Sequence, residues 1–237
     1  FGSTYYLING LIKNSGIETT FVEAVDIEAY EAAIQENTRL IFVEVIGNPK
    51  LDVVDIAAVS RVATQANIPL VVDTTFVPSY LCDIKSLGAH VVINATTKYL
   101  CGGNSAVGGV ITDLGVFNWS EHCSKALLEM KKFGKNAFIA AVKKVRANSG
   151  CAMTPLNAFL TIAALETLAI RMDRHCQTAL KVAQFLKLHS KVVTVTYPGL
   201  SDHLQADLVS TQFPKGCGGM LTIRLGQGQN MEKVMDQ

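Results

Sequence analysis

The sequence predicts an α/β fold with a mostly parallel sheet covered by helices on both faces. Short, nearly continuous apolar runs alternate with helical stretches through the first half of the chain. Such runs are typical of strands buried on both faces, and their alternation with helices is typical of βαβ units. The chain has 237 residues, of which 49% are apolar, so it can bury a substantial core.

The individual elements of this first half follow from local patterns. β-branched and aromatic runs predict strands at residues 19–22, 40–45, 69–73, 91–93 and 109–112. Between them we expect helices at residues 26–36 and 55–67, each begun by an aspartate N-cap, and a short helix that ends at Gly88. Ligands of such sheets collect at the carboxyl ends of the strands.

The pattern changes near Gly150, which we take as the boundary between a large domain (1–150) and a second domain (151–237). Thr154 and Pro155 predict a helix start. A long helix is expected to follow, with an apolar face marked by Leu156, Phe159, Leu160, Ala163 and Leu168. We expect a second helix at about 175–189 and strands at 192–197 and 220–225, which together form the start of a smaller α+β domain. The lysine-rich region 117–145 is expected to be a solvated helical connection.

Charge and cysteine content exclude several classes of function. Lys and Arg number 21 against 20 for Asp and Glu, so we expect no nucleic-acid partner. The apolar runs are shorter than the roughly 20 residues that span a bilayer, so we expect no membrane segment. Six scattered cysteines, without a Cys-x-x-Cys pair or a secretory leader, favour a reduced compartment, and we expect the cytoplasm. Without His or Cys at ligand spacing, we predict no metal site.

Lys98 is the first candidate for chemistry. It follows the apolar strand 91–93, adjoins the hydroxyls of Thr96 and Thr97, and runs into the glycine-rich stretch 101–109. A lysine held at a strand end among hydroxyls and flexible backbone can carry an aldehyde cofactor as a Schiff base, with its phosphate on the hydroxyls. The glycines also suggest a nucleotide phosphate loop. That interpretation is weaker, because the lysine precedes the glycines.

Asp73 is the second candidate, because it ends an apolar strand and a buried anion must be paired. A protonated pyridine nitrogen would pair it and keep the ring an electron sink. An aspartate that caps the next turn is the alternative. One strand–helix–strand unit separates Asp73 from Lys98, which puts both at one sheet edge. Glu44 and Asn48, after the preceding strand, could complete the polar contacts of the ring, although Asn-Pro pairs are most often turns.

Several blocks of the chain, in order, resemble the Cys/Met-metabolism enzymes that use pyridoxal phosphate. They are residues 1–5, 44–49, 72–76, 95–99 and 108–113, continued by 153–159, 165–168, 171–175 and 197–199. The resemblance implies the fold of PLP-dependent transferases (aspartate aminotransferase-like, fold type I). Within the family, residues 46–52, 117–119 and 214–216 look most like O-acetylhomoserine sulfhydrylases. Methionine γ-lyases and cystathionine γ-synthases or lyases are close alternatives.

The resemblance also implies a role for individual residues. Lys98 matches the Schiff-base lysine, and Asp73 matches the partner of the pyridine nitrogen. The other implied cofactor contacts are Thr97 at the phosphate, Asn48 near the ring hydroxyl, Thr75 behind the ring, and Phe1 stacked on it. Phe1 stands where the family usually has a tyrosine, and phenylalanine can stack but cannot transfer a proton. Ala95 stands where a serine usually binds the phosphate.

The activity implied by the resemblance is exchange of the acyl group of O-acetylhomoserine, or a similar O-acylhomoserine, for sulfide or a thiol, which gives homocysteine or methionine. The implied assembly is a homotetramer built from dimers that share active sites. We expect the chain to be the central piece of a longer protein that also has an upstream phosphate loop and a downstream arginine for the substrate carboxylate. Two other classes stay open: a non-catalytic remnant that serves subunit association, and a nucleotide-dependent oxidoreductase. No Gly-x-Gly-x-x-Gly follows the first strand, which disfavours the oxidoreductase.

Overall fold

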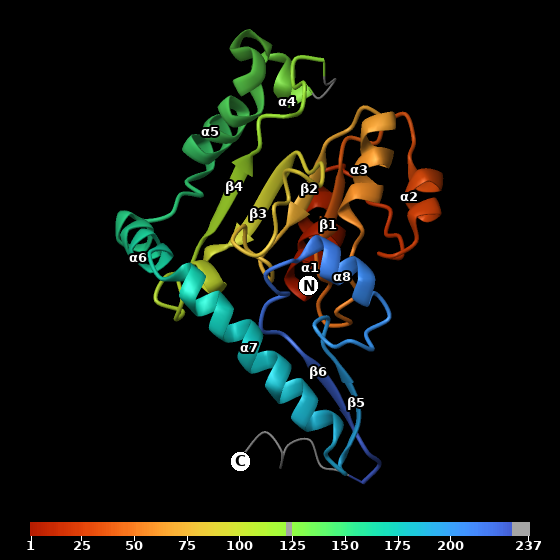
Figure 1. Cartoon of the computed structure of the whole chain (residues 1–237). Helices are drawn as coiled ribbons and strands as arrows, with labels where there is room; N and C mark the ends of the chain where they lie inside the picture. The colour runs from red at the N-terminus through yellow and green to blue at the C-terminus, as the bar shows by residue number, and fades with distance from the viewer. Residues whose placement is uncertain (122–124, 229–237) are drawn as a thin grey trace.

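A four-stranded sheet forms the centre of the computed structural model, which describes residues 1–121 and 125–228 (Figure 1). The strands lie in the order β1 (Ile41–Glu44), β2 (Leu70–Asp73), β3 (Val91–Ala95) and β4 (Gly109–Asp113). β1, β2 and β3 run parallel, and β4 pairs antiparallel with β3. The predicted α/β fold with a mostly parallel sheet is therefore confirmed.

Alternate residues of the central strands face two separate apolar cores. Leu70, Val72 and Val92 belong to the larger core, whereas Val71 and Val91 belong to the smaller one. Successive side chains of a strand point to opposite faces of the sheet, so a strand buried on both faces must be apolar throughout. This is the physical origin of the continuous apolar runs.

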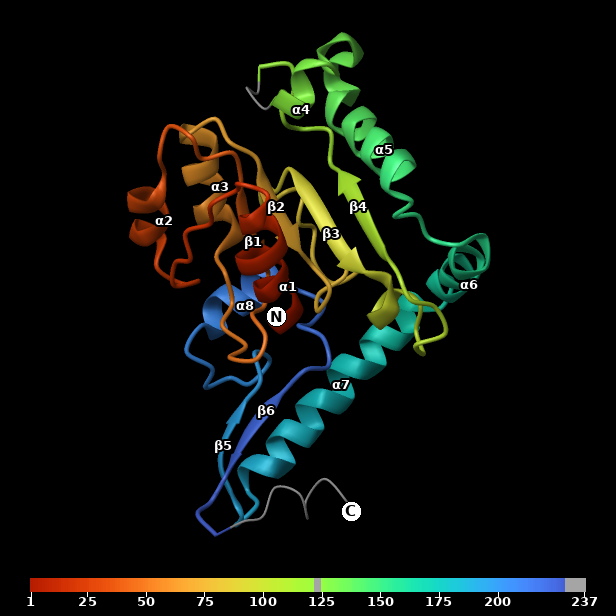
Figure 2. The ribbon, with the colours of Figure 1, turned by 180° about the vertical axis from the view of Figure 1, so that it is seen from behind.

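The helices of the large domain begin where aspartates cap them. Asp26 accepts a hydrogen bond from Ala29 N–H at the start of α2 (Ile27–Ala33), and Asp55 accepts one from Ala58 N–H at the start of α3 (Ile56–Gln65). One helical face of α3 is buried, through residues such as Val59 and Val62. Both caps were predicted, although α2 ends three residues before the expected Glu36. At the chain start lie α1 (Gly2–Tyr6) and η1 (Leu7–Ile12), with α1 over the face of the sheet turned to the viewer in Figure 2.

Two predicted elements of the large domain are wrong. Residues 19–22 form no strand, because no other strand of the described chain pairs with them, and a strand without a ladder leaves its backbone groups unpaired. The segment before Gly88 is a series of turns rather than a helix. Its backbone hydrogen bonds close single turns, such as Leu81 N–H to Pro78 O and Gly88 N–H to Lys85 O. These turns do not continue into a helix.

The lysine-rich connection is helical, as predicted, but it is only partly solvated. It contains α4 (Lys125–Leu128), η3 (Lys131–Asn136) and α5 (Ala137–Ser149). Trp119 is buried and stacks on Phe138, with ring centroids 4.4 Å apart. These rings belong to the smaller core and cover one face of the sheet, so the connection also has a packing role.

The two helices expected after Thr154 are both present, but the first is shorter than expected and the second begins earlier. Thr154 caps α6 (Pro155–Leu165) by accepting from Asn157 N–H, as its sequence predicted, but a bend of 68° separates α6 from α7 (Leu168–Lys187). The second helix therefore starts seven residues before the expected His175. Gly150, the predicted domain boundary, caps the end of α5 in the left-handed conformation, with φ of 72°, which glycine adopts without steric cost. The division into two domains stays a prediction.

The end of the described chain forms an antiparallel pair of strands beside α7. β5 (Val192–Thr196) pairs with β6 (Thr222–Leu225), and α8 (Ala206–Gln212) lies between them in sequence. Gln212 ties this part to the start of α3, because its side-chain amide accepts from Ile56 N–H at 3.1 Å and donates to Val54 O at 3.0 Å. α7 extends from the region of β3 to the β5–β6 pair in both ribbon views (Figures 1 and 2).

No single helix within residues 1–121 and 125–228 is long and apolar enough to span a membrane. The bent pair α6 and α7 passes a test of length and composition only when its two helices are joined across the break.

Stability should fall as the pH drops below about 6.5, in part through His90. Nδ1 of this buried imidazole accepts from Leu70 N–H at 2.8 Å. Burial lowers the pKa of His90, and the carboxylate of Asp113 opposes this effect. A lowered pKa means that the folded state prefers the neutral ring. The contribution of His90 to stability is therefore complete above its pKa in the unfolded state, about 6.5, and is lost as the pH falls through its pKa in the folded state. One group changes the free energy of unfolding by at most about 1.4 kcal/mol per pH unit.

The measurement is urea unfolding of the parent and of His90→Gln between pH 7.5 and 5. Glutamine can accept the same hydrogen bond but does not titrate, so the variant should lose less stability than the parent over this range. His203, whose pKa burial also lowers, is retained in both proteins. Equal pH slopes for the two proteins would contradict the prediction.

Candidate active site

The register of the sheet brings four chain segments to one edge. Glu44 at the end of β1 is paired with Asp73 at the end of β2, and Ala95 at the end of β3 is opposite Gly109 at the start of β4. β1, β2 and β3 end together because they are parallel, and β4 begins there because it returns antiparallel. The functional residues that follow these strand ends therefore converge.

A cavity of about 680 Å³ opens at this edge. This volume is in the range of sites that hold small molecules and cofactors, about 300 to 1,000 Å³. Its walls come from the start of the chain, from the three strand ends, from the glycine-rich stretch, and from His175 and Met220. The lining residues include Phe1, Glu44, Asn48, Asp73, Thr75, Phe76, Ala95, Lys98, Tyr99, Gly102, Gly108, His175 and Met220.

Five of the six residues predicted from the sequence line this one cavity, namely Lys98, Asp73, Asn48, Thr75 and Phe1. The sixth, Thr97, does not line it. Its hydroxyl accepts from Gly108 N–H at 3.1 Å and lies 3.4 Å from Gly108 O, so it joins the lysine segment to the start of β4. The individual roles of all six residues stay predictions.

Asp73 is held with one carboxylate oxygen fixed. Oδ1 accepts from Thr75 N–H at 2.8 Å, and the Thr75 hydroxyl accepts from Ala95 N–H at 2.9 Å. Thr75 thus links the end of β2 to the end of β3. The other carboxylate oxygen of Asp73, Oδ2, has no hydrogen bond in the described part of the chain. The turn interpretation of Asp73 is in part correct, because it does bind a backbone amide two residues on, yet the second oxygen stays available to a group in the cavity.

Lys98 lies in η2 (Thr96–Leu100), a short helical segment that interrupts the passage from β3 to the glycine-rich stretch. Its backbone is not helical, with φ of −90° and ψ of −124°. The side chain lines the cavity, and no hydrogen bond or ion pair of its amine is recorded within residues 1–121 and 125–228. Lys98 is the only lysine or arginine that lines the cavity in this part of the chain.

The lining residues that were not predicted from the sequence include Tyr99, His175 and Met220. The His175 ring lies against Tyr99 with centroids 5.3 Å apart, and the Tyr99 hydroxyl accepts from Gly219 N–H at 3.0 Å. Burial raises the pKa of Tyr99, and the bond from Gly219 opposes this rise. No local pattern in the sequence indicates these positions, because His175 reaches the cavity only through the direction that α7 takes after the bend.

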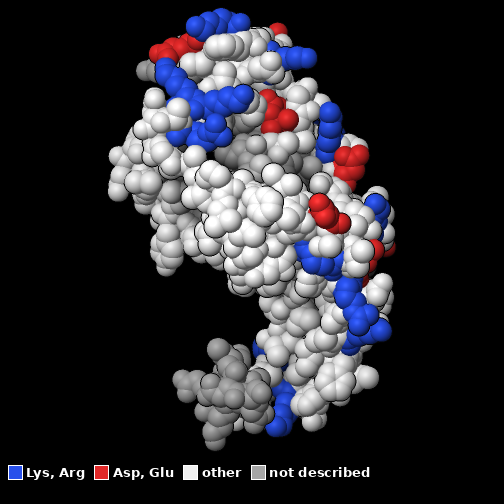
Figure 3. All heavy atoms as spheres, turned by 90° about the vertical axis from the view of Figure 1, so that its left-hand side faces the viewer, with Lys and Arg blue, Asp and Glu red and all other residues white. Residues whose placement is uncertain are grey.

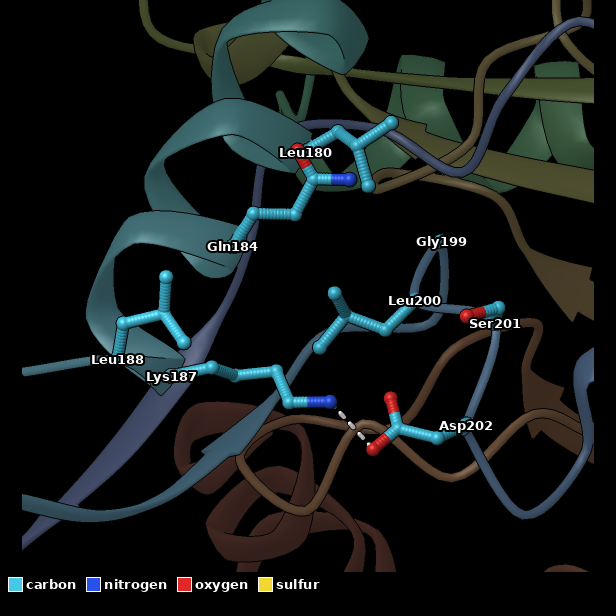
Figure 4. A pocket seen from close by; sticks show the side chains of 8 residues that line it. All are labelled: Leu180, Gln184, Lys187, Leu188, Gly199, Leu200, Ser201 and Asp202. Carbon is cyan, nitrogen blue, oxygen red and sulfur yellow. Dashed lines mark hydrogen bonds and ion pairs between the residues drawn. The ribbon is translucent and has the colours of Figure 1, made fainter.

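A second cavity, of about 410 Å³, lies between α7 and the loop Gly199–Asp202 (Figure 4). Leucines 180, 188 and 200 line it, and Lys187 and Asp202 form an ion pair of 2.5 Å at its edge. Its two charged groups pair with each other, so neither the amine of Lys187 nor the carboxylate of Asp202 is free. We therefore place the candidate site at the larger cavity.

The larger cavity fits an aldehyde cofactor with a basic ring nitrogen. Lys98 provides an amine without a partner in the described chain, Asp73 provides a carboxylate oxygen, and Phe1 provides an aromatic face. An amine can bond to the aldehyde, a carboxylate can hold a protonated nitrogen, and a flat ring can stack on the aromatic side chain. Pyridoxal phosphate combines these features.

Comparison with known proteins supports this assignment. Residues 1–237 match the family described as "Cys/Met metabolism PLP-dependent enzyme". O-acetyl-L-homoserine sulfhydrylase of Leptospira meyeri is 39% identical, over 85% of this chain and 50% of its own length, and cystathionine gamma-lyase of Bacillus subtilis is 33% identical, over 99% and 56%. The solved O-acetylhomoserine sulfhydrylase of Wolinella succinogenes superposes with a TM-score of 0.86 at 39% identity, over 95% of this chain and 64% of that one. The chain thus spans about half the length of the curated relatives it matches.

Proposed function

The chain belongs to the Cys/Met metabolism PLP-dependent enzyme family, and on this premise we propose that the whole protein replaces the acyl group of an O-acylhomoserine by sulfur. The substrate is O-acetylhomoserine or a similar ester, the sulfur donor is sulfide or a thiol, and the product is homocysteine or methionine. The observation that supports this proposal best is the convergence of Lys98 and Asp73 on one cavity. Two relatives named as O-acetylhomoserine sulfhydrylases support the choice of substrate.

Pyridoxal phosphate supplies, when bound, an aldehyde that joins an amine and a ring that accepts electron density. Lys98 would hold the cofactor through its amine, and the same amine, when free, would move protons between the substrate carbons. Asp73 would hold a proton at the ring nitrogen through Oδ2, while Thr75 N–H fixes Oδ1. The acyl group leaves the γ-carbon as a carboxylate, and the sulfur donor adds at the same carbon.

Phe1 and Asn48 complete the proposed set of ring contacts. Phe1 stacks on the ring but donates no proton, so proton transfer falls to Lys98. Asn48 would bind the ring hydroxyl, and its backbone N–H donates to Glu44 Oε2 at 3.2 Å. A side-chain amide can both donate to and accept from such a hydroxyl.

Ala95→Ser should tighten cofactor binding about tenfold or more. Ala95 lines the cavity, and a hydroxyl at this position can donate one hydrogen bond to the phosphate, worth about 1.5 to 3 kcal/mol when the acceptor is charged. Thr96→Val is the matched control. The Thr96 hydroxyl is buried, lacks a partner within the described chain and does not line the cavity, so its loss should leave binding unchanged. Equilibrium titration of the cofactor-free variants measures both effects, and a stronger effect of Thr96→Val than of Ala95→Ser would contradict this account.

The reaction itself is tested by the products. We expect homocysteine and the free acyl carboxylate from an O-acylhomoserine and sulfide. Release of an oxo acid and ammonia from methionine or cystathionine would indicate a lyase, the activity named for the Bacillus subtilis relative. Absence of turnover with every substrate, in a protein that binds the cofactor, would favour the non-catalytic alternative.

Assembly as a homotetramer with shared active sites is part of the same proposal. α6 and the start of α7 expose large apolar side chains, with Leu156, Phe159 and Ile162 each about 65% exposed and Ile170 74% exposed. Figure 3 shows few charged groups over the middle of the face that carries α6, while Lys and Arg gather at its upper end. An apolar patch of this kind is typical of a subunit contact. We also propose a cytoplasmic location, which the scattered free cysteines favour.

A further inference from the structure

Arg171 lies just after the bend between α6 and α7 and faces the segment that carries Lys98. Its guanidinium donates three hydrogen bonds: Nη1 to Tyr99 O at 2.7 Å, Nη2 to Ala164 O at 2.8 Å, and Nε to Thr167 Oγ1 at 3.1 Å. Ala164 is near the end of α6, and Thr167 immediately precedes α7. One rigid, planar group thus joins the bend between these helices to the residue that follows Lys98.

The same guanidinium packs on Gly102. A methyl group at Gly102 would lie 2.9 Å from Arg171 Cζ, so it would displace the guanidinium, and the φ of +78° itself favours glycine. The Gly102 N–H donates to the carbonyl of Lys98 at 3.2 Å. Arg171 therefore contacts the lysine segment at two points, the Tyr99 carbonyl and the glycine that binds Lys98.

External contacts of this kind are needed because the backbone at Lys98 is not helical. A regular helix would fix the direction of the lysine through its own hydrogen bonds. Here the next residue, Tyr99, is anchored at its carbonyl by Arg171 and at its hydroxyl by Gly219 N–H. The orientation of Lys98 thus depends on contacts from the second half of the chain.

We propose that Arg171 is a positioning residue that aims the Lys98 amine into the cavity. Arg171 does not line the cavity itself, so it acts through the backbone of Tyr99 and Gly102. This inference rests on the proposed role of Lys98 and extends it, because it makes the bend between α6 and α7 a part of the site. A displacement of about 1 Å can lower the rate of a reaction that needs close alignment by about 10²-fold.

The test is the rate at which cofactor-free full-length protein attaches pyridoxal phosphate at Lys98, trapped at time points with borohydride and read by peptide mass mapping. Arg171→Met should attach the cofactor about tenfold more slowly or worse. Arg171→Lys, whose ammonium can reach one carbonyl but cannot form the fork, should be intermediate. Arg174→Met is the matched control, since Arg174 is exposed on the same helix and lines no cavity, and it should match the parent.

Hydrogen exchange of the cofactor-free proteins gives a second measurement that does not depend on activity. Faster exchange confined to the amides of residues 98–102 is expected in Arg171→Met, while the amides of β1, β2 and β3 exchange as in the parent. If Arg171→Met does not fold, Arg171→Lys carries the same comparison. Attachment at the parental rate in either variant would overturn the role of Arg171 and leave the proposed function intact. A parent protein without a pyridoxyl mass at Lys98 would overturn both.

Discussion

Replacing Lys98 by alanine should lower kcat for sulfur transfer by about 10²- to 10⁴-fold, the usual contribution of a positioned proton carrier. Alanine keeps the backbone and removes the amine that lines the cavity. The variant should also lose the visible absorbance of the bond between lysine and cofactor, while it retains weaker, non-covalent binding. Steady-state kinetics and absorbance titration of the purified full-length protein measure the two effects.

Lys181→Ala is the control for this prediction, because Lys181 is exposed on α7 and does not line the cavity. It should leave both kcat and the absorbance within about twofold of the parent, as is usual for surface positions away from special contacts. Full activity in Lys98→Ala would show that another amine holds the cofactor.

Asp73→Asn is expected to lower kcat about 10²- to 10³-fold with little effect on the fold. Asparagine has nearly the same shape and can still accept from Thr75 N–H, but it has no charge to hold a proton at the ring nitrogen. Loss of one member of a buried charged pair typically costs about 2 to 5 kcal/mol, and each 1.4 kcal/mol is about tenfold in rate. The kinetic measurement is accompanied by thermal unfolding to verify that the variant is folded.

Asp55→Asn is the matched control, since Asp55 caps α3 by accepting from Ala58 N–H and asparagine caps helices equally well. This variant should retain the parental kcat. A fall of less than about threefold in Asp73→Asn would contradict the pairing of Asp73 with the ring nitrogen.

The sheet and the edge of the cavity could be predicted because they depend on local patterns. Apolar runs such as Leu70 to Val72 are continuous only when both faces of a strand are buried, and parallel strands bring their carboxyl ends together. The sequence therefore predicts Asp73, Asn48 and Lys98 at one edge of the sheet. The caps Asp26, Asp55 and Thr154 follow from the same local hydrogen-bonding rules.

Features that depend on contacts between distant segments could not be predicted. The apolar periodicity of residues 156–168 continues across the bend, so it placed Leu168 in the first helix, whereas Leu168 begins the second. Arg171 binds the bend at Ala164 and Thr167 and also binds Tyr99, 72 residues away. The bend directs His175 to the cavity. Residues 19–22 have strand-like composition but lack a partner strand in the described chain. Composition alone does not determine whether a partner exists.

Identification of the lysine that carries the cofactor tests the account most directly. The full-length protein, loaded with pyridoxal phosphate, is reduced with borohydride, digested and mapped by mass spectrometry. We predict that the pyridoxyl mass is found on the peptide that contains Lys98 and on no other peptide. A pyridoxyl mass on a different lysine, or on none, would contradict the assignment of Lys98 and, with it, the proposed function.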